Sequence, residues 1–359
     1  MKKIDKLLLL SVILLTVFGL IMIYSSSNIW AEYKFNDGFK YLKSQTLFLI
    51  LSYISIFIIS KIPYTIYKKY ANTLLFICIV LLILVLIPGI GTIRNGSRSW
   101  FGIGPLGIQP SEFTKLALII YTSKYLTNNK IKDIKTSILP LLIIVFLIFG
   151  LIMLEPDFGT GIIIVISIIS LLFISGVNMS FFIKLGILGL IGIIVLIIIA
   201  PYRLERIISF INPWSDPLGS GFQIIQSLYA IGPSGLLGMG LGNSIQKHFY
   251  LPEPQTDFIF SIISEELGFL GIIIIATLFI TIIYRGFKIS IKQEDNFAKY
   301  LSFGITFSIA FQTILNLMVV VGLIPVTGVT LPFLSYGGSS LLISMTSIGI
   351  LLNISKNKI

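Results

Sequence analysis

Ten apolar runs follow one another along the chain, each close to the length of a transmembrane helix. A helix that crosses a bilayer needs about 17–25 predominantly apolar residues. The runs lie near Leu7–Tyr24, Ser44–Ile62, Asn72–Ile90, Ser111–Leu126, Ser137–Leu154, Gly159–Gly176, Phe181–Ala200, Asp257–Tyr284, Ala298–Leu323 and Ser335–Ile354. The pattern therefore predicts an all-α polytopic membrane protein, with residues 1–359 forming a single membrane domain.

The first run follows a basic start and could be mistaken for a secretory signal peptide. Its 18 positions, Leu7–Tyr24, exceed the roughly 7–15 residues of a cleavable apolar core. No clear Ala-x-Ala cleavage site follows it. We therefore expect this run to be retained as the first membrane helix.

Composition supports the same fold class. Hydrophobic residues make up 55% of the chain, charged residues 11%, and the mean hydropathy is +0.99, whereas soluble domains hold roughly 45–50% apolar and about 25% charged residues. An ordinary soluble globule is excluded. The single cysteine, Cys78, lies in an apolar run, so we expect a small buried side chain and no disulfide framework.

Lysines and arginines are distributed unequally between the two sides that ten spans define. With a cytoplasmic N-terminus, 17 of the 26 cationic residues fall in cytoplasmic segments and eight in external ones, and Lys115 lies within a span. Four acidic residues are inside and eight outside, so the two sides carry +13 and 0. Because cations favour the cytoplasmic side, both termini are predicted to be cytoplasmic. The net charge of +11 is then attributed to membrane topology and to contact with anionic lipids, and it is not taken as a sign of nucleic-acid binding.

One connection is much longer than the others. The segment Pro201–Thr256, between the seventh and eighth runs, is predicted to be extracytoplasmic and contains 56 residues. Loops of more than about 12–15 residues are usually functional or disordered, and this one is rich in aromatic and aliphatic residues. We expect it to be ordered on the membrane surface, with short helices such as Gly221–Ile231.

Charged residues at the edges of the spans are the first candidates for function, because they are costly in a membrane. Glu112 and Lys115 open the fourth run at i,i+3 spacing, which favours a pair; such a pair could equally serve only to pin the helix. Asp257 opens the eighth run, where it or Thr256 could simply cap the helix. Glu265 lies about two turns further along.

Further polar groups lie in the other predicted outer turns. Two carboxylates stand in the turn Glu155–Gly161, Arg94 and Arg98 precede Trp100, and a turn rich in hydroxyl groups and glycine spans Pro325–Ser340. The inner side offers mainly lysine. The pattern therefore predicts a working site on the extracytoplasmic side.

That location restricts the chemistry. An enzyme outside the cytoplasm has no ATP supply, so one that builds bonds needs a substrate that is already activated. Carboxylates beside cations in a membrane-level cleft suit a lipid-linked pyrophosphate, because a carboxylate can take the proton of an attacking hydroxyl and cations can neutralise the leaving pyrophosphate. No Ser-His-Asp set is expected, since His248 is the only histidine. A transporter with polar sites at membrane depth stays open as an alternative.

Several motifs resemble the SEDS family of FtsW, RodA and SpoVE type. They are Arg98-Ser-Trp-Phe-Gly, Gln109-Pro-Ser-Glu-Phe-Thr-Lys115, Asn212-Pro-Trp-Ser-Asp-Pro-Leu-Gly-Ser-Gly-Phe-Gln, Tyr250 through Phe260 with Glu265-Glu-Leu-Gly268, and Pro332-Phe-Leu-Ser-Tyr-Gly-Gly-Ser-Ser340. The resemblance covers essentially all ten runs. It implies a glycosyltransferase of the bacterial cytoplasmic membrane that polymerises lipid II, an undecaprenyl-pyrophosphate disaccharide pentapeptide, and acts with a class B penicillin-binding protein.

The resemblance also assigns roles to residues. It implies that Asp257 is the essential carboxylate and that Glu112 and Lys115 support the cavity. Many members have His where this chain has Gln255, so an imidazole role is not expected there. We take Arg98, Gln255, Thr256, Glu265, Ser335 and Ser339, all within these motifs or beside Asp257, as further substrate-binding or supporting positions.

An α-linked donor and a β-linked product require a single inverting displacement, so we predict one base, Asp257, and no covalent intermediate. Arg98, Lys115 or a divalent cation, Mg²⁺ or Mn²⁺, is expected to partner the pyrophosphate. A lipid II flippase or other transporter, and a non-catalytic scaffold that recruits the penicillin-binding protein, are the alternatives. The motifs favour the division or sporulation branch over the elongation branch.

Overall fold

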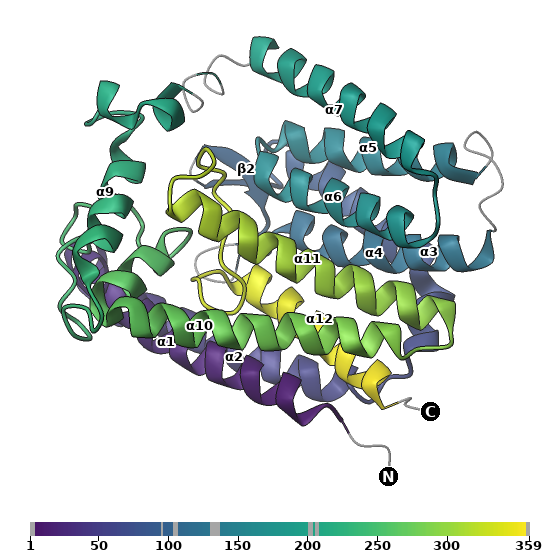
Figure 1. Ribbon diagram of the computed structural model, residues 1–359, viewed down its shortest axis with the longest axis horizontal. Helices are drawn as coiled ribbons and strands as arrows, with labels where there is room; N and C mark the ends of the chain where they lie inside the picture. Colours follow the sequence, from purple (N-terminus) through teal and green to yellow (C-terminus); the bar gives the residue numbers. More distant parts are fainter. Residues whose placement is uncertain are drawn as a thin grey trace.

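Long helices form almost the whole of the protein. The computed structural model in Figure 1 describes residues 4–94, 96–102, 107–129, 137–199, 204 and 208–356. Its long helices are α1 (Lys6–Phe35), α2 (Lys40–Ile59), α3 (Tyr64–Leu86), α4 (Pro110–Asn128), α5 (Leu139–Leu154), α6 (Phe158–Ile174), α7 (Met179–Ile199), α10 (Ile259–Ile291), α11 (Asn296–Val320) and α12 (Gly338–Ser355). Each of the ten predicted runs coincides with one of them, so the prediction of an all-α polytopic membrane protein is confirmed.

Length and composition separate these helices into three groups. Six described helices are long and apolar enough to cross a membrane, namely α1, α2, α3, α10, α11 and α12. Three more are apolar but shorter over their described residues: Leu139–Leu154, Phe158–Ile174 and Met179–Gly192. The tenth, α4, is more polar because it carries Glu112 and Lys115. Eight of the counted cations, Lys2, Lys3, Lys130, Lys132, Lys135, Arg203, Arg206 and Lys358, lie outside the described residues.

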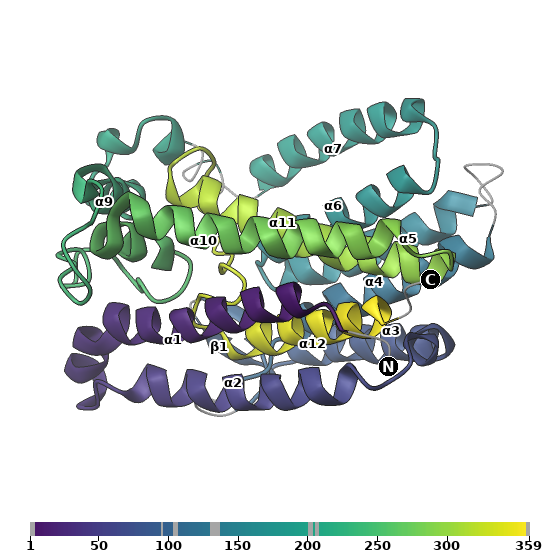
Figure 2. The ribbon, with the colours of Figure 1, turned by 60° about the horizontal axis from the view of Figure 1, so that its bottom comes forward.

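The helices run roughly parallel or antiparallel to one another, with α11 at the centre (Figures 1 and 2). Helix α11 packs against α4, α6, α10 and α12, while α1 packs against α2 and α10. Helix α7 lies at the edge of the bundle in both views, and most of its described apolar side chains are exposed. In a protein whose solvent is lipid, such a surface needs no polar cover.

Both ends of the chain lie at the same end of the bundle (Figure 2). Asp5 caps α1, because its carboxylate accepts from Leu8 N at 3.1 Å. The same carboxylate pairs with Arg285 of α10, and the backbone N–H of Asp5 donates to Ser355 Oγ at 3.2 Å. The N-terminus is thereby tied to the C-terminal ends of α10 and α12.

The opposite end holds the irregular structure that positions the site. A two-stranded antiparallel hairpin, β1 (Thr92–Arg94) and β2 (Ser97–Trp100), lies between α3 and α4. The long loop contains α9 (Phe222–Ile231) between two 3₁₀ turns, η2 (Pro213–Ser215) and η3 (Gly232–Ser234). The short helix predicted at Gly221–Ile231 is therefore confirmed. Ser227 of α9 donates to Val320 O at 2.6 Å and shares a hydrogen bond with Ser261 Oγ, so α9 is held against α10 and α11.

Helix α10 is interrupted, although the sequence indicated one continuous run. Gly268 has φ 63° and ψ −159°, which is not helical. The segment 235–240 supplies the missing backbone bonds: Met239 and Gly240 donate to Glu265 O and Glu266 O, both at 2.9 Å, while Phe269 and Leu270 donate to the carbonyls of residues 235 and 236. Broken helices are tolerated at membrane depth where protein satisfies the freed groups, and here the long loop does so.

The segment between α11 and α12 enters the protein rather than lying on its surface. Leu331, Phe333 and Leu334 are all almost fully buried. Helix α1 leaves space for this segment at Gly19, since a Cβ there would lie 2.8 Å from Phe333 O. Because this backbone is irregular, its carbonyl groups need side-chain partners, and these partners connect the segment to the candidate site.

Candidate active site

Asp257 lies in a turn immediately before α10. Helix α10 begins at the end of the bundle opposite the chain termini (Figure 1). The side chain of Asp257 is partly exposed, and Oδ1 accepts from Thr256 Oγ1 at 2.9 Å. The N-cap position of α10 is occupied by Phe258, so neither Thr256 nor Asp257 stands at the capping position that the sequence suggested for them. The turn itself is fixed from α11, where Asn316 Nδ2 donates to Asp257 O at 2.7 Å.

Glu112 and Lys115 form the ion pair that their spacing predicted. Lys115 Nζ lies 2.9 Å from Glu112 Oε2, and both side chains are less than one-tenth exposed. Lys115 also donates to Gln312 Oε1 of α11 at 2.7 Å. A buried cation therefore has two partners here, and an ammonium group has a third N–H to offer.

Two carboxamides of α11 connect these groups and were missed from the sequence. Gln312 and Asn316 lie one helical turn apart, on the same face. Gln312 Nε2 donates to Thr330 O at 3.0 Å, and Asn316 Nδ2 donates to Val329 O at 2.7 Å as well as to Asp257 O. The signal that could have found them is a pair of polar residues within an apolar helix, since such residues are costly in a membrane.

A second pair of acids lies in the turn between α5 and α6. Asp157 caps α6 through Thr160 N at 3.0 Å and accepts from Gln109 Nε2 at 3.0 Å. Burial raises the pKa of Asp157 and hydrogen bonds from Thr160 lower it, while the charges of Glu112 and Lys115 have smaller, opposite effects. Asp157 therefore belongs to the electrostatic surroundings of the Glu112–Lys115 pair.

Glu155 is more deeply buried. Its side chain is 0% exposed, and neither carboxylate oxygen has a hydrogen-bond partner among the described residues. Burial, and after it the charge of Asp157, raises the pKa of Glu155 to about 9. Its backbone carbonyl accepts from Ser97 of β2, which holds the hairpin over this turn.

The predicted supporting residues Ser335, Ser339 and Gln255 tie the irregular segments together. Ser335 Oγ accepts from Leu331 N at 2.8 Å. Ser339 Oγ accepts from Gln109 N and donates to Gly107 O, both at 3.1 Å. Gln255 is 2% exposed, and its backbone carbonyl accepts from Tyr336 N at 2.8 Å. These contacts hold Ser335 within the segment between α11 and α12 and join Ser339 of α12 to the residues just before α4.

Arg98 lies on β2, on the same side of the bundle as the turn of Asp257. Its side chain is partly buried, and it takes part in none of the ion pairs seen among the described residues. An arginine side chain can bind an anionic ligand through its paired N–H groups.

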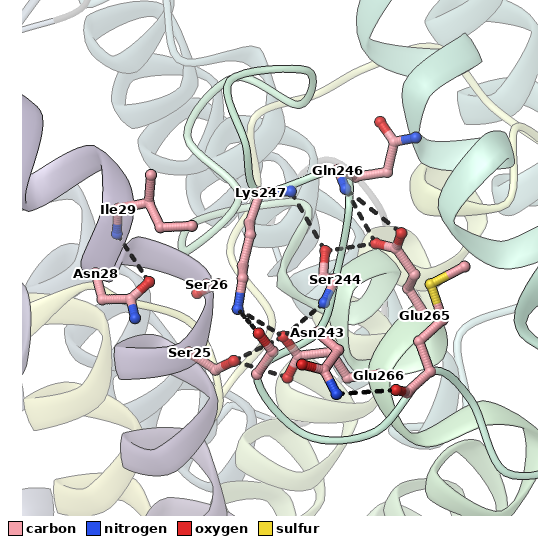
Figure 3. Close-up of polar contacts among 12 residues, drawn as sticks. Ser25, Ser26, Asn28, Ile29, Asn243, Ser244, Gln246, Lys247, Glu265 and Glu266 are labelled. Carbon is pink, nitrogen blue, oxygen red and sulfur yellow. Dashed lines mark hydrogen bonds and ion pairs between the residues drawn. The ribbon is translucent and has the colours of Figure 1, made fainter.

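Glu265 belongs to a separate polar cluster, shown in Figure 3. Its carboxylate accepts from Ser244 Oγ at 2.5 Å and from Ile245 N at 2.9 Å. The adjacent Glu266 lies 3.3 Å from Lys247 Nζ and accepts from Ser25 Oγ of α1 at 2.7 Å. The structure thus places both glutamates where they hold the loop 239–247 to α10 and α1.

This geometry supports acid–base and anion chemistry at one end of the protein. A partly exposed carboxylate, Asp257, can accept a proton. The cations Lys115 and Arg98 can stabilise negative charge on a phosphate. Across the part of the chain that the structure describes, no group of three or more His, Cys, Asp or Glu side chains could hold a metal ion.

Comparison with known proteins identifies relatives over nearly the whole chain. The chain is 51% identical over 354 residues to Stage V sporulation protein E of Bacillus subtilis, covering 98% of this chain and 97% of that protein. It is 42% identical over 353 residues to a protein named probable peptidoglycan glycosyltransferase FtsW from Trichlorobacter lovleyi, covering 98% and 93% of the two chains.

Solved structures are similar over nearly the whole length. A chain of a peptidoglycan synthase complex, described for its coordination of polymerization and crosslinking, superposes with a TM-score of 0.79 at 28% identity and covers 99% of this chain and 98% of its own. The rod shape determining protein RodA of Thermus thermophilus gives 0.73 at 26% identity, with coverage of 99% and 97%. The model of the FtsW/RodA/SpoVE family, described as cell cycle proteins, matches residues 5–359. The chain therefore belongs to the FtsW/RodA/SpoVE family, as the motifs indicated.

Proposed function

We propose that this protein is a glycosyltransferase that polymerises lipid II into peptidoglycan glycan strands. The names of its FtsW relatives and of the similar synthase complex support this activity. One observation carries the proposal: a single face of α11 contacts both groups. Asn316 binds the backbone carbonyl of Asp257, and Gln312, one turn away, binds Lys115 of the buried Glu112–Lys115 pair.

The proposed reaction is one inverting displacement. Asp257 accepts the proton of the acceptor 4-hydroxyl, the hydroxyl oxygen forms a bond to the donor anomeric carbon, and the bond to the pyrophosphate oxygen breaks. Lys115 and Arg98 neutralise the negative charge that develops on the departing pyrophosphate. We further propose that any Mg²⁺ or Mn²⁺ ion enters with the pyrophosphate, because magnesium sites commonly combine one or two carboxylates with substrate phosphates.

The test is polymer formation by purified protein in detergent, with labelled lipid II and with or without the cognate transpeptidase. Asp257→Asn is expected to abolish glycan strands. Asp37→Asn is the matched control, because Asp37 forms an exposed pair with Lys43 at 2.8 Å and such pairs contribute little to stability. Full activity of Asp257→Asn would remove this residue from the mechanism, and a metal chelator in the same assay tests the divalent cation.

A lipid II flippase is a second candidate, favoured by one observation. Helix α10 is discontinuous at Gly268, and discontinuous helices form the substrate sites of many transporters. In detergent there is no bilayer to cross, so polymer made there requires a polymerase. A flippase would instead move labelled lipid II between leaflets of reconstituted vesicles and make no polymer in detergent.

A non-catalytic scaffold is the third alternative. It would recruit a penicillin-binding protein but make no polymer itself, and Asp257→Asn would leave that recruitment unchanged.

We propose that the protein spans the bacterial cytoplasmic membrane with both termini in the cytoplasm and the site outside, and that a class B penicillin-binding protein is its partner. The shared position of the two termini and the lysine distribution support this orientation. Cysteines introduced at the exposed positions Asp216 and Glu294 test it in whole cells, because Cys78 is buried. An impermeant maleimide should label position 216 and not 294, and the reverse result would overturn the orientation.

A further inference from the structure

Asn316 is a fully buried amide in the middle of the polar contacts around Asp257. Its side chain is 0% exposed, and its Nδ2 group donates to Asp257 O and to Val329 O, each at 2.7 Å. We propose that Asn316 is a positioning residue for the reaction, which holds Asp257 in place without touching the substrate. This inference rests on the function proposed above and adds a residue to it.

The geometry suits this role because an amide group has two N–H donors. One bond reaches the turn before α10, and the other reaches the buried segment between α11 and α12. Both acceptors are backbone carbonyls outside helices, so neither has a bond within a helix to hold it. In a buried site of low dielectric such bonds are strong, and loss of the donor removes one hydrogen bond from each of the two carbonyl groups.

Gln312 repeats the arrangement one turn away. Its Nε2 donates to Thr330 O at 3.0 Å, next to the carbonyl that Asn316 holds, and its Oε1 accepts from Lys115 at 2.7 Å. Two successive carbonyls are therefore bound by two amides on one face of α11. The separation between the proposed base and the buried cation is set by this helix, and catalysis is sensitive to shifts of about 1 Å.

The chain offers a matched control for a purely structural effect. Asn353 of α12 is also buried, and its amide donates to Ser60 O at 2.9 Å and accepts from Tyr64 N at 3.1 Å. It lies in the last turn of α12, and α12 ends beside the C-terminus, at the end of the bundle opposite the start of α10 (Figure 1). Loss of either asparagine removes one buried and one partly buried hydrogen bond, but only Asn316 contacts the turn of the proposed base.

The experiment compares Asn316→Leu with Asn353→Leu by thermal unfolding and by kcat and KM for lipid II polymerisation. We expect both variants to lower Tm by similar amounts, and Asn316→Leu alone to lower kcat by about 10–100-fold with KM within about twofold of wild type. Asn316→Gln, which retains the amide, should recover part of kcat. Equal kcat values for the two leucine variants at matched Tm would overturn the proposal.

A replacement variant and a double substitution test the same role of Asn316 in other ways. If Asn316→Leu does not fold, Asn316→Ser replaces it, since a hydroxyl keeps one donor and fills less space. In an Asp257→Glu background, loss of the Asn316 amide should reduce activity several-fold less than it does in wild type, because the effects of substitutions at contacting residues are not additive. Fully additive effects of the two substitutions would overturn the proposal. Failure of wild-type protein to make any polymer would instead overturn the proposed function.

Discussion

Gly238 of the long loop and Gly268 of α10 approach each other so closely that neither position has room for a side chain. A Cβ at Gly268 would lie 2.4 Å from Gly238 N, and a Cβ at Gly238 would lie 2.6 Å from Gly268 N. Both residues also have positive φ, 70° and 63°. The break in α10 and the course of the loop therefore depend on the same two glycines.

Substitution of Gly268 by alanine should destabilise the folded protein. At φ 63° and ψ −159° the backbone of Gly268 lies in a region essentially restricted to glycine, where a residue with a Cβ costs about 1–3 kcal/mol. The contact with backbone atoms adds to this cost, so we expect a loss of at least about 2 kcal/mol. Gly150→Ala in α5 is the control, because no atom lies within 4 Å of its Cβ position and alanine is the better helix former. Thermal unfolding in detergent measures both, and an unchanged Tm for Gly268→Ala would contradict the geometry.

The ion pair of Lys247 and Glu266 should contribute strongly because it is almost completely buried, with side chains 3% and 0% exposed. Removal of one partner of a buried pair commonly costs about 3–5 kcal/mol, since the other charge is left uncompensated. Lys247→Met should therefore destabilise the protein and expose the loop 239–247 to proteases. The double variant Lys247→Met with Glu266→Gln should lose less than Lys247→Met alone. A double variant that loses the sum of both effects would show that the two charges do not stabilise each other.

Asp5 combines a helix cap with an ion pair, and two substitutions separate these contributions. Asp5→Asn keeps the cap, because Asn and Asp are similar at this position, but removes the charge that binds Arg285 at 2.5 Å. We expect a loss of about 1.5–3 kcal/mol. Asp5→Ala should cost roughly 1 kcal/mol more. Chemical denaturation measures the difference, and equal stability of the two variants would mean that the cap contributes nothing.

Most of the fold followed from the sequence because bilayer thickness fixes the length of an apolar helix. The pair of Glu112 and Lys115 was also predictable, since both residues lie on one helix and their spacing alone decides the contact. Contacts such as Lys115 to Gln312, which are 197 positions apart, depend on how α4 packs against α11. No local pattern carries that information.

The interruption of α10 was missed for a related reason. An isolated glycine within an apolar run is compatible with a continuous helix. The break at Gly268 is stable because residues 235–240 donate and accept the bonds that the helix gives up. The hairpin β1–β2 was likewise unexpected, because its strands have only three and four residues, too few to show an alternating pattern.

The buried carboxyl group of Glu155 should make stability depend on pH. It lies in the turn between α5 and α6, and burial raises its pKa from 4.5 to about 9. The folded protein therefore keeps this proton at neutral pH, whereas the unfolded chain releases it above about pH 4.5. Because the folded state binds the extra proton, the contribution of Glu155 to stability falls as pH rises from about 4.5 to about 9 and is constant outside this window.

Glu155→Gln removes the titrating group and retains its size. The Tm of the variant should rise relative to that of wild type as pH is raised from 5 to 8.5. In wild type the folded state becomes less stable relative to the unfolded state, because only the unfolded state releases the proton of Glu155, whereas glutamine does not titrate. Asp216→Asn is the control: hydrogen bonds from Ser220 lower the pKa of Asp216, so this group stays ionised throughout and its Tm difference from wild type should be constant. Parallel curves for wild type and Glu155→Gln would contradict a raised pKa of Glu155 in the folded protein.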